Sequence, residues 1–568
     1  MIKKIITGYI KTLTGLHIGT GEITETTDSP IYRNVNGDIV IPGTAIAGAL
    51  RSLATRIAPY LGYEKCIALD ENPQFDKNQQ SKLCNCVVCD LFGPISIGKG
   101  SEEGRASKLW IYDAVLINDI KASIRDGIGI DRETGTSSRK ARAKYDFEVV
   151  PKNSLFSFRI ALQENVSEKE ERLLSCVLAE WQNGRGYLGG NVARGVGNIQ
   201  LKDIKVFSIN LSDVNTLIRF LKEEDEIRIA EEEKDWLERN INEARQQLKD
   251  AMDIADNEYL YNSFAQIDLT LKFSGGFVIN DILKSFQSGF DFCPKIENGR
   301  FVFPGSSFRG ILRSHAEKIA RSLVTLSSSN ERDFLNKCPA CNPFADKEDP
   351  LTSCNVLFRK YKYTHKDEEI KDNKLCLACQ VFGSSFKGSR LYVSDGEMVN
   401  SPKIKIMDFL AIDRFTGGGK EGAKFDAIVL WQPKFRLRIF IENPKEWQLG
   451  WLMLVMKDLK EGLISFGFGK NKWFGKATIE DEKIKVGAIS EAFILQGLKK
   501  GDSYEGIFNV QILKLKDLTE DNNNPAELWI REFHKVLSNL KRKKGFIPAS
   551  DTYFKRDVFE LYPREVKL

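Results

Sequence analysis

The sequence predicts an α+β fold that is present twice in tandem. The two halves share five segments in the same order: IPGTAIAGALRS with FPGSSFRGILRS, CVVCDLFG with CLACQVFG, SKLWIYDA with SRLYVSDG, GIDRETG with AIDRFTG, and YLGGNVARGVGNIQL with SFGFGKNKWFGKATI. Each half also opens on an alternating strand pattern, KKIITGYIKTL or AQIDLTLKF, which leads through a loop to a Pro-Gly helix start. This mixture of elements is typical of α+β domains, and a repeat of this length is a whole domain.

The repeat sets the expected domain boundaries. We expect a first domain over residues 1–210 and a second over residues 259–486. Residues 211–258 are highly charged, contain no Gly or Pro and have helical spacing, so they predict a helical connector. Residues 487–568 have no counterpart in the first half and predict a C-terminal α/β extension.

Within each predicted domain the elements follow one order. The helix after the loop begins at Pro-Gly-Thr or Pro-Gly-Ser, so Thr44 or Ser306 is its expected N-cap. In the first half its apolar stripe is Ile46, Leu50, Leu53 and Ile57. A cysteine-rich insertion follows, then strands around Trp110 and Tyr392, and finally a strand near a Gly-rich turn.

The composition is that of a soluble globular protein. The chain has 568 residues, of which 42% are hydrophobic and 28% charged, and its net charge of +5 permits nucleic acid as a partner without requiring it. The alternating start MIKKIITGYI predicts a strand rather than a signal peptide, and no apolar run is long enough to span a membrane. We therefore expect a cytoplasmic protein with no membrane partner.

The cysteines predict two structural zinc sites, in insertions at about residues 60–95 and 330–385. The predicted ligands are Cys66, Cys84, Cys86 and Cys89 in the first half, and Cys338, Cys341, Cys376 and Cys379 in the second. Cys354 lies between the two pairs of the second half, and the sequence leaves open whether it replaces another ligand. Four thiolates leave zinc no open position, which excludes a catalytic role. The alternative is a set of free buried thiols.

The two helix starts are candidate sites for RNA phosphates, because helix N-termini and nearby cations attract anions. The residues concerned are Gly43, Thr44 and Arg51 in the first half, and Gly305, Ser306, Ser307, Arg309 and Arg313 in the second. Plain capping with a solvated arginine is the alternative. Arg194 in the Gly-rich turn adds positive charge, as do Arg139, Lys140 and Arg142 in a basic loop, although most charge runs are solvated loops.

Several of these features together resemble the RAMP superfamily, specifically the backbone subunits of type III CRISPR effector complexes. They are the loop with Asp28, the P-G-S/T-x-h-x-G-x-h-R helix start, the IDR..TG loop and the LGG...ARGVGN turn. The resemblance covers roughly residues 1–205 and 263–480, so the chain looks like two such subunits fused, as in type III-D variants. It implies ferredoxin-like, RRM-related domains with thumbs at about residues 120–150 and 405–430. The implied partners are guide (crRNA) and target RNA and the other subunits of the complex.

The resemblance also implies an endoribonuclease that cleaves target RNA. The acid of the family's D-S-P loop falls on Asp28, and a divalent cation such as Mg²⁺ would assist it. In the second half the loop is shorter, Phe292 takes the matching slot, and the nearby acid is Asp291. The second site is therefore either active with a shifted acid or silent.

Two alternatives remain at this point. One is a non-catalytic RNA-binding scaffold subunit of the same kind of complex. The other, a stand-alone RNA-processing ribonuclease, is disfavoured because the chain has only four histidines. Further acids recur in both halves, namely Asp126, Asp131 and Asp146 with Asp408, Asp413 and Asp426. Their recurrence fits either a share in catalysis or pairing with Arg132 and Arg414.

Overall fold

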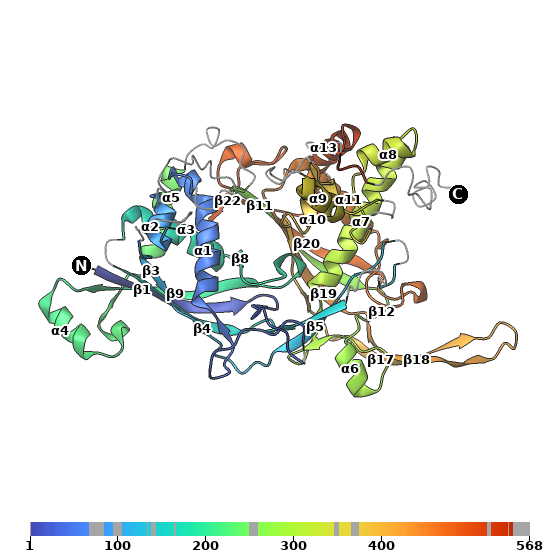
Figure 1. The fold of residues 1–568 in the computed structure, drawn as a ribbon, viewed down its shortest axis with the longest axis horizontal. Coiled ribbons are helices and arrows are strands. Elements are labelled where there is room, and N and C mark those ends of the chain that lie inside the picture. Colours follow the sequence, from blue (N-terminus) through green and yellow to red (C-terminus); the bar gives the residue numbers. More distant parts are fainter. Residues whose placement is uncertain are drawn as a thin grey trace.

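The computed structural model describes residues 2–25, 27–66, 84–94, 105–132, 135–137, 144–163, 166–248, 259–345, 351–364, 374–519, 524–543 and 545–548. Figure 1 shows two bodies of mixed helix and strand side by side, one from each half of the chain. The architecture is therefore α+β in both halves, as predicted. None of the described helices combines the length and the apolar character needed to cross a membrane.

The opening segment of the chain, β1 (Ile2–Thr12), is the middle strand of the first sheet. The sheet has the order β10-β9-β1-β7-β3, with β8 paired to β9. The other strands are β3 (Leu109–Ile111), β7 (Leu155–Leu162), β8 (Gly186–Tyr187), β9 (Asn198–Asn210) and β10 (Glu231–Glu232). Each strand is antiparallel to its neighbours, and β3 lies at the outer edge. On β1, the side chains of Ile6 and Ile10 are buried in the core.

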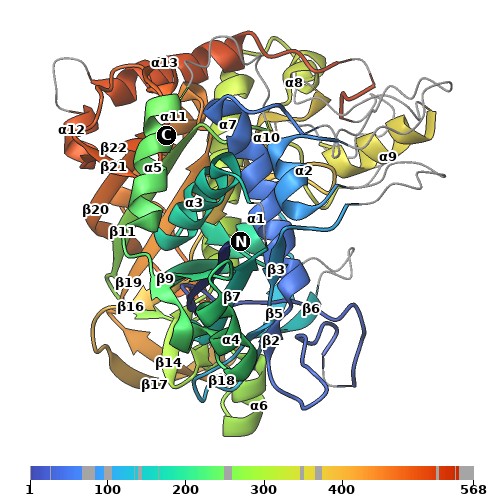
Figure 2. The same ribbon diagram turned by 90° about the vertical axis from the view of Figure 1, so that its left-hand side faces the viewer.

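Helices cover one side of this sheet, as Figure 2 shows for α1, α2, α3 and α5. They are α1 (Gly43–Ile57), followed by η1 (Ala58–Leu61), and then α2 (Val87–Phe92), α3 (Glu168–Gln182) and η2 (Val192–Arg194). On α1 the predicted stripe residues Ile46, Leu50 and Ile57 are buried, and Leu53 packs partly buried against the same core. Burial of this stripe explains why the Pro-Gly-Thr segment continues as a helix.

The N-caps are not those we predicted. Pro42 and Pro304 occupy the cap positions and no side chain of the cap residue bonds to the helix, so neither Thr44 nor Ser306 is the cap. Instead, a remote aspartate accepts the first free N–H of each helix. Gly43 donates to Asp113 over 2.7 Å, and Gly305 donates to Asp395 over 2.9 Å. A carboxylate at this end also interacts favourably with the helix dipole.

The second sheet has the order β13-β14-β16-β19-β11-β20-β22-β21, with β15 paired to β19. Its strands are β11 (Ser263–Phe273), β13 (Ile296–Glu297), β14 (Arg300–Phe303), β15 (Leu391–Val393), β16 (Gly396–Met398), β19 (Lys434–Glu442), β20 (Ala477–Ala488), β21 (Ser503–Glu505) and β22 (Phe508–Leu513). The arrangement of β11 between β19 and β20 repeats that of β1 between β7 and β9.

The helices of the second half are α6 (Ile282–Ser288), α7 (Gly305–Leu326), α8 (Glu331–Lys337), α9 (Cys354–Thr364), α10 (Leu377–Phe382), α11 (Glu446–Lys460) and η6 (Lys470–Lys472). The C-terminal part adds η7 (Glu491–Phe493), α12 (Leu515–Thr519) and α13 (Pro525–Ser538). Trp451 of α11 stacks on Phe533 of α13, and β22 extends the sheet beside β20. The tail is therefore part of the second body.

Between the halves lie α4 (Val214–Lys222), η3 (Glu226–Ile229) and α5 (Trp236–Gln247). The buried Trp236 donates to Glu171 over 2.7 Å, which holds α5 against α3. Asp213 and Asp225 accept N–H groups at the starts of α4 and η3, so local capping divides the charged segment into separate turns of helix.

Each half also carries a β-hairpin outside its main sheet. In the first half it is β5 (Ser123–Ile128) with β6 (Lys144–Val149), and β2 (Val40–Ile41) pairs with β4 (Ala114–Val115) nearby. In the second half β17 (Lys403–Ile412) pairs with β18 (Gly419–Trp431), beside β12 (Gly276–Phe277). Figure 1 shows the β17–β18 hairpin as an arm that extends well beyond the second body.

Candidate active sites and nucleic-acid interface

Asp28 is held by a reciprocal pair of hydrogen bonds with Asp146. The backbone N–H of Asp28 donates to Oδ1 of Asp146 over 2.8 Å, and the N–H of Asp146 donates to Oδ2 of Asp28 over 3.1 Å. Asp28 is exposed on its loop, whereas Asp146 is half-buried on β6. This arrangement, which we call the acid clasp, fixes the loop acid against the hairpin and leaves the second oxygen of each carboxylate outside it.

The second half contains the same acid clasp. Asp291 donates its N–H to Oδ1 of Asp426 over 2.9 Å, and Asp426 donates its N–H to Oδ2 of Asp291 over 2.9 Å. Although this loop is shorter, Asp291 occupies the position that Asp28 holds, and Phe292 forms a bridge with Ala427 of β18. In the sequence, the repeated AKYD and AKFD segments indicated the strand acids Asp146 and Asp426. They did not indicate that these acids contact the loop acids.

The surroundings of the two clasps differ. Beside the first, Nδ1 of His17 donates to the carbonyl oxygen of Glu148 over 2.6 Å, and the Ser29 hydroxyl lies 3.2 Å from Nε2. A carbonyl only accepts, so Nδ1 is the donor in the contact with Glu148. The Glu148 carboxylate accepts from Arg33 and from the Ile31 N–H. Burial works against its ionisation, but these contacts lower the pKa of Glu148.

The second clasp lies on aromatic rings instead. Phe292 stacks on Phe468 with ring centroids 4.1 Å apart, and Phe425 lies edge-on to both. In the repeat, Val278 stands where the first half has His17, and Ile428 stands where it has Glu148. Sequence reasoning did not single out His17, although comparing GLHIG with GFVIN would have shown this difference.

The other recurrent acids have different neighbours. Asp126 faces Asp146 across the β5–β6 pair, as Asp408 faces Asp426 across β17–β18. Burial raises the pKa of Asp126, and Lys144 only partly offsets this. Asp413 accepts the N–H groups of two turn residues over 2.9 Å, which is ordinary turn chemistry.

Arg132 does not pair with Asp126 or Asp131 through any bond that the structure records. It crosses to the second half, where it donates to the buried Glu317 of α7 over 2.9 Å. The pairing of Arg132 with a recurrent acid, which the repeats suggested, is therefore wrong. Its actual partner is an acid on the other half of the chain, and sequence spacing cannot reveal such a contact.

A pocket lies where the two halves meet. It is lined by Arg125, Asp126, Gly127, Tyr145, Phe147, Arg194, Val196, Ile279, Asn280, Lys295, Pro304, Ser306 and Ser307. The Gly-rich turn of the first half thus lies beside the helix start of the second. A Cβ on Gly195, which has φ of +88°, would lie 2.7 Å from the Cα of Gly305, so a glycine is required there. Arg194 is exposed beside this contact.

Arg309 of α7 lies close to this pocket. It donates to the carbonyl oxygen of Phe382 and to Ser389, and no carboxylate of the described residues bonds to it. Burial lowers its pKa to about 9, and the charges of Arg313, Arg194 and Arg132 add to that effect. An anion placed among these side chains would be strongly stabilised.

Two predicted phosphate ligands point into the protein. Arg51 donates to the carbonyl oxygen of Gly93 over 2.8 Å and to Sγ of Cys89 over 3.4 Å. Arg313 donates to Glu317 over 2.7 Å and to Sγ of Cys379 over 3.5 Å. These guanidinium groups tie the helix to its cysteine insertion, and their contact with RNA stays a prediction.

The remaining predicted phosphate ligands fall into three sets. The N–H groups of Gly43 and Gly305 are not free, because aspartates accept them. The hydroxyls of Thr44 and Ser306 are exposed, and Ser307 is half-buried. Arg139, Lys140 and Arg142 lie outside the described residues.

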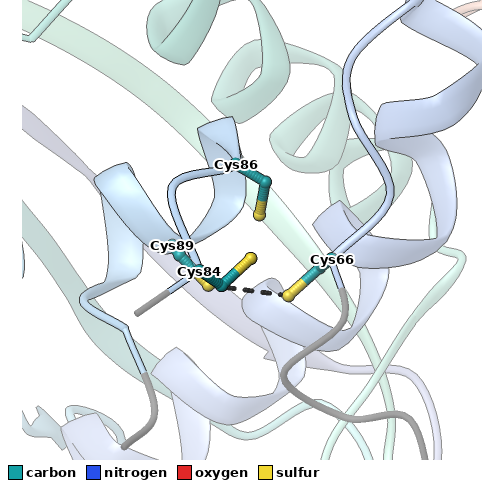
Figure 3. A group of neighbouring side chains, drawn as sticks. All are labelled: Cys66, Cys84, Cys86 and Cys89. Atoms are coloured by element: carbon teal, nitrogen blue, oxygen red, sulfur yellow. Dashed lines mark hydrogen bonds between the residues drawn. The ribbon is translucent and has the colours of Figure 1, made fainter. Parts of the chain in front are cut away.

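The cysteines of the first half gather as predicted. The sulfur atoms of Cys66, Cys84, Cys86 and Cys89 all lie within 4.8 Å of one another, and Figure 3 shows them turned toward a common centre. Cys86 is the N-cap residue of α2, which places its sulfur at the start of that helix. Four thiolates at this spacing are a donor set that suits zinc.

In the second half one ligand differs from the prediction. The gathered sulfur atoms are those of Cys341, Cys354, Cys376 and Cys379, so Cys354 takes the place that we gave to Cys338. Cys354 begins α9, and Arg542 from the C-terminal tail donates to its sulfur over 3.5 Å. The Cys338 thiol is turned to the carbonyl oxygen of Ala340 instead. The CPAC spacing made Cys338 the natural choice from the sequence, because a C-x-x-C pair places two thiols close together, whereas Cys354 is not part of such a pair.

Comparison with known proteins identifies matches in both halves. The family model of the RAMP superfamily matches residues 9–200 and 293–478. A protein of Methanocaldococcus jannaschii named "CRISPR system Cms endoribonuclease Csm3" is 26% identical over 218 residues, which are 36% of this chain and 80% of the relative. A protein of the same name from Methanothermobacter thermautotrophicus is 27% identical over 227 residues, 36% of this chain and 84% of the relative.

Proposed function

Because this chain belongs to the RAMP superfamily, with matches over both halves, we propose that it is a subunit of a type III CRISPR ribonucleoprotein. In this proposal it binds guide RNA and cleaves complementary target RNA as an endoribonuclease. Each half is then one ferredoxin-like RAMP domain, over residues 1–210 and 259–486, with its hairpin as the thumb. Support comes from the two relatives, which are named as CRISPR endoribonucleases.

The acid clasp is the observation that carries the catalytic part of the proposal. Asp28 and Asp291 are exposed loop acids, yet each is held in place by two hydrogen bonds to a hairpin acid. A turn acid with no further role needs no such support, since Asp serves in turns by local bonds alone. Two halves with different loop lengths preserve the same clasp, which favours a task shared by both.

The clasp carboxylates fit a divalent cation such as Mg²⁺. Magnesium prefers oxygen ligands and is commonly held by one or two carboxylates together with substrate phosphates. When bound, it would offset phosphate charge and make an attacking oxygen more acidic. Asp28 would hold the ion through its oxygen outside the clasp, and Asp146 would orient that carboxylate. The backbone N–H groups of these residues would keep the two carboxylates oriented.

The path of the guide is proposed from the charges where the halves meet. Arg309 lacks a carboxylate partner among the described residues, Arg194 is exposed beside it, and Ser306 presents an exposed hydroxyl at the start of α7. A phosphate in this position would provide the missing counter-charge and use the helix dipole. In the first half Thr44 holds the position equivalent to Ser306.

We expect Arg194 and Arg309 to contribute to RNA affinity through charge. Each phosphate contact with single-stranded RNA contributes a slope of about 0.7 on log–log axes of affinity against salt. Arg194→Ala and Arg309→Gln should each lower that slope by about this amount, measured by fluorescence anisotropy at several salt concentrations. Arg531→Ala, which removes an exposed arginine of the tail helix α13, is the control and should leave the slope unchanged. Equal slopes for all variants would place the RNA elsewhere.

Both cysteine groups are proposed to hold structural zinc. We expect the purified chain to contain about two zinc ions, and Cys354→Ser to contain about one. Cys338→Ser is the matched control, because its thiol faces Ala340 rather than the group. Elemental analysis of the three proteins measures this. Loss of an ion in Cys338→Ser, with full content in Cys354→Ser, would restore the ligand set that the sequence suggested.

A non-catalytic role is the second candidate, and it applies chiefly to the second half. There the clasp lies on Phe292 and Phe468, and Val278 and Ile428 replace the polar groups found beside Asp28. An apolar wall is a poor environment for charged phosphate and metal. That half then serves as a scaffold for RNA.

Bound RNA gives the direct test of the proposed function. The full chain is purified from its source organism, and the RNA that accompanies it is extracted and sequenced. The proposal expects a defined population of guide RNAs. It also expects cleavage of a complementary target, with no cleavage after chelation of divalent ions. Protein that carries no RNA, or a random RNA population, would contradict it.

A further inference from the structure

The interface between the two halves shows how one edge of a RAMP sheet is covered. At the edge of the second sheet, β15 lies against η2 of the first half. Tyr392 of β15 stacks on Tyr187 of the first half, with ring centroids 4.9 Å apart. The chain therefore contains one complete example of a partner seated on this edge.

Charged contacts continue the same interface. Asp395, just after β15, is only 6% exposed and accepts two bonds from Arg125 of the first-half hairpin, over 3.0 and 2.8 Å. Arg125 also donates to Glu297 over 2.6 and 2.7 Å. With the ion pair between Arg132 and Glu317, two arginines of the first half satisfy three buried acids of the second.

The equivalent edge strand of the first half, β3, pairs with β7 on one side, and no described strand pairs with its other side. We call β3 and the two residues after it, 109–113, the free edge. Trp110, which corresponds to Tyr392, is 57% exposed, and Val115 and Ile117 are 39% and 55% exposed. Asp113, which corresponds to Asp395, is exposed and forms no ion pair within the described part of the chain. An exposed aromatic ring beside a carboxylate that forms no ion pair with a described residue is typical of an interaction surface at a sheet edge.

A second copy of this chain does not complement the free edge. In a head-to-tail pair, the second half of one copy would contact the free edge of the other copy, in the way that the first half contacts β15 within one chain. At the place of Tyr187 it carries Ser465, and at the place of Arg125 it carries Met407. The receiving side also differs, since Val35 and Thr55 stand where the second half has Glu297 and Glu317. Copy-to-copy contact would bury Asp113 without a cation, which is costly.

We propose that the free edge binds a different protein, which places an aromatic ring on Trp110 and an arginine on Asp113. The internal interface supplies the template for both contacts, and the missing groups in Ser465 and Met407 exclude a second copy. Trp and Arg are residue types that dominate interface affinity when buried. This inference does not depend on the chemistry of Asp28 or Asp291.

The test introduces into the second half the aromatic ring and the arginine that the first half uses in the internal interface. Wild-type full-length chain, freed of RNA, is compared by sedimentation velocity with the variant Ser465→Tyr/Met407→Arg. We expect wild type to stay monomeric and the variant to associate head to tail, with affinity raised about tenfold or more. Adding Asp113→Asn to the variant should reverse the gain. If Met407→Arg unfolds the chain, Ser465→Tyr alone tests the ring contact, because Ser465 lies at a half-buried loop position.

Three outcomes decide the matter. Association of the variant that depends on Asp113 supports the proposal. Association of wild type that is lost in Asp113→Asn would overturn it, because a second copy would then be the occupant. A folded variant that stays monomeric, with Ser465→Tyr also monomeric, would overturn it too, because the template chemistry would not bind this edge.

Discussion

Replacing Asp28 with asparagine is expected to abolish one cut in the target RNA and to leave RNA binding intact. Loss of one essential catalytic group typically slows a reaction by about three orders of magnitude. Asn keeps the size of the side chain, so the backbone bonds around Asp146 survive. The measurement is single-turnover cleavage of a labelled target by the assembled complex, with guide affinity measured in parallel.

Asp146, the partner of Asp28 in the acid clasp, provides a variant with a smaller expected loss of cleavage rate. Asp146→Asn keeps an oxygen that can accept the N–H of Asp28 but loses the charge, and we expect a loss of about 10- to 100-fold, as for groups that orient metal ligands. Asp38→Asn is the matched control, because Asp38 is an exposed acid at the end of the same loop and, among the described residues, bonds only to Asn34. A loss in Asp38→Asn as large as that in Asp28→Asn would mean that the loop, rather than the acid, matters.

Removing Arg125 is expected to be the most destabilising single change between the halves. Arg125→Ala leaves Glu297 and Asp395 buried without a cation, and loss of one partner from a buried pair costs about 3–5 kcal/mol. Chemical unfolding of the full chain, followed by fluorescence, measures the change. Because the two halves share this contact, we also expect the unfolding transition to broaden or divide.

Lys152→Ala is the control for this prediction. Lys152 pairs with Glu397 over 2.9 Å, also between the halves, but both side chains are partly exposed. Such pairs contribute about 0–1 kcal/mol. If Arg125→Ala destabilised the chain no more than Lys152→Ala does, the buried cluster would not hold the halves together.

The sequence predicts what depends on local pattern and on the repeat. The alternating opening segments became the central strands β1 and β11, and the Pro-Gly segments became the starts of α1 and α7. The repeat also made Asp146 and Asp426 visible as candidates. These features follow from hydrophobic periodicity and internal comparison, which need no knowledge of distant contacts.

Contacts between distant segments could not be predicted. Arg51 and Arg313 look like phosphate ligands from their distance to the helix start, yet each reaches a cysteine insertion whose position the sequence does not show. The aspartates that accept the first N–H groups of the helices lie in short connections between strands, far from the helices in the chain. Cys354 was undecided for the same reason, because only tertiary packing brings α9 to the other thiols.

One measurement tests the central claim directly: a denaturing gel of target-RNA fragments from complexes that carry Asp28→Asn, Asp291→Asn or both. The account predicts that Asp28→Asn loses one cut while the flanking cuts remain. Asp291→Asn either loses a second cut or, if the aromatic surroundings silence that half, matches wild type. Survival of every cut in the double variant, with guide RNA still bound, would contradict the assignment of the clasp acids and turn attention to Asp126 and Asp408.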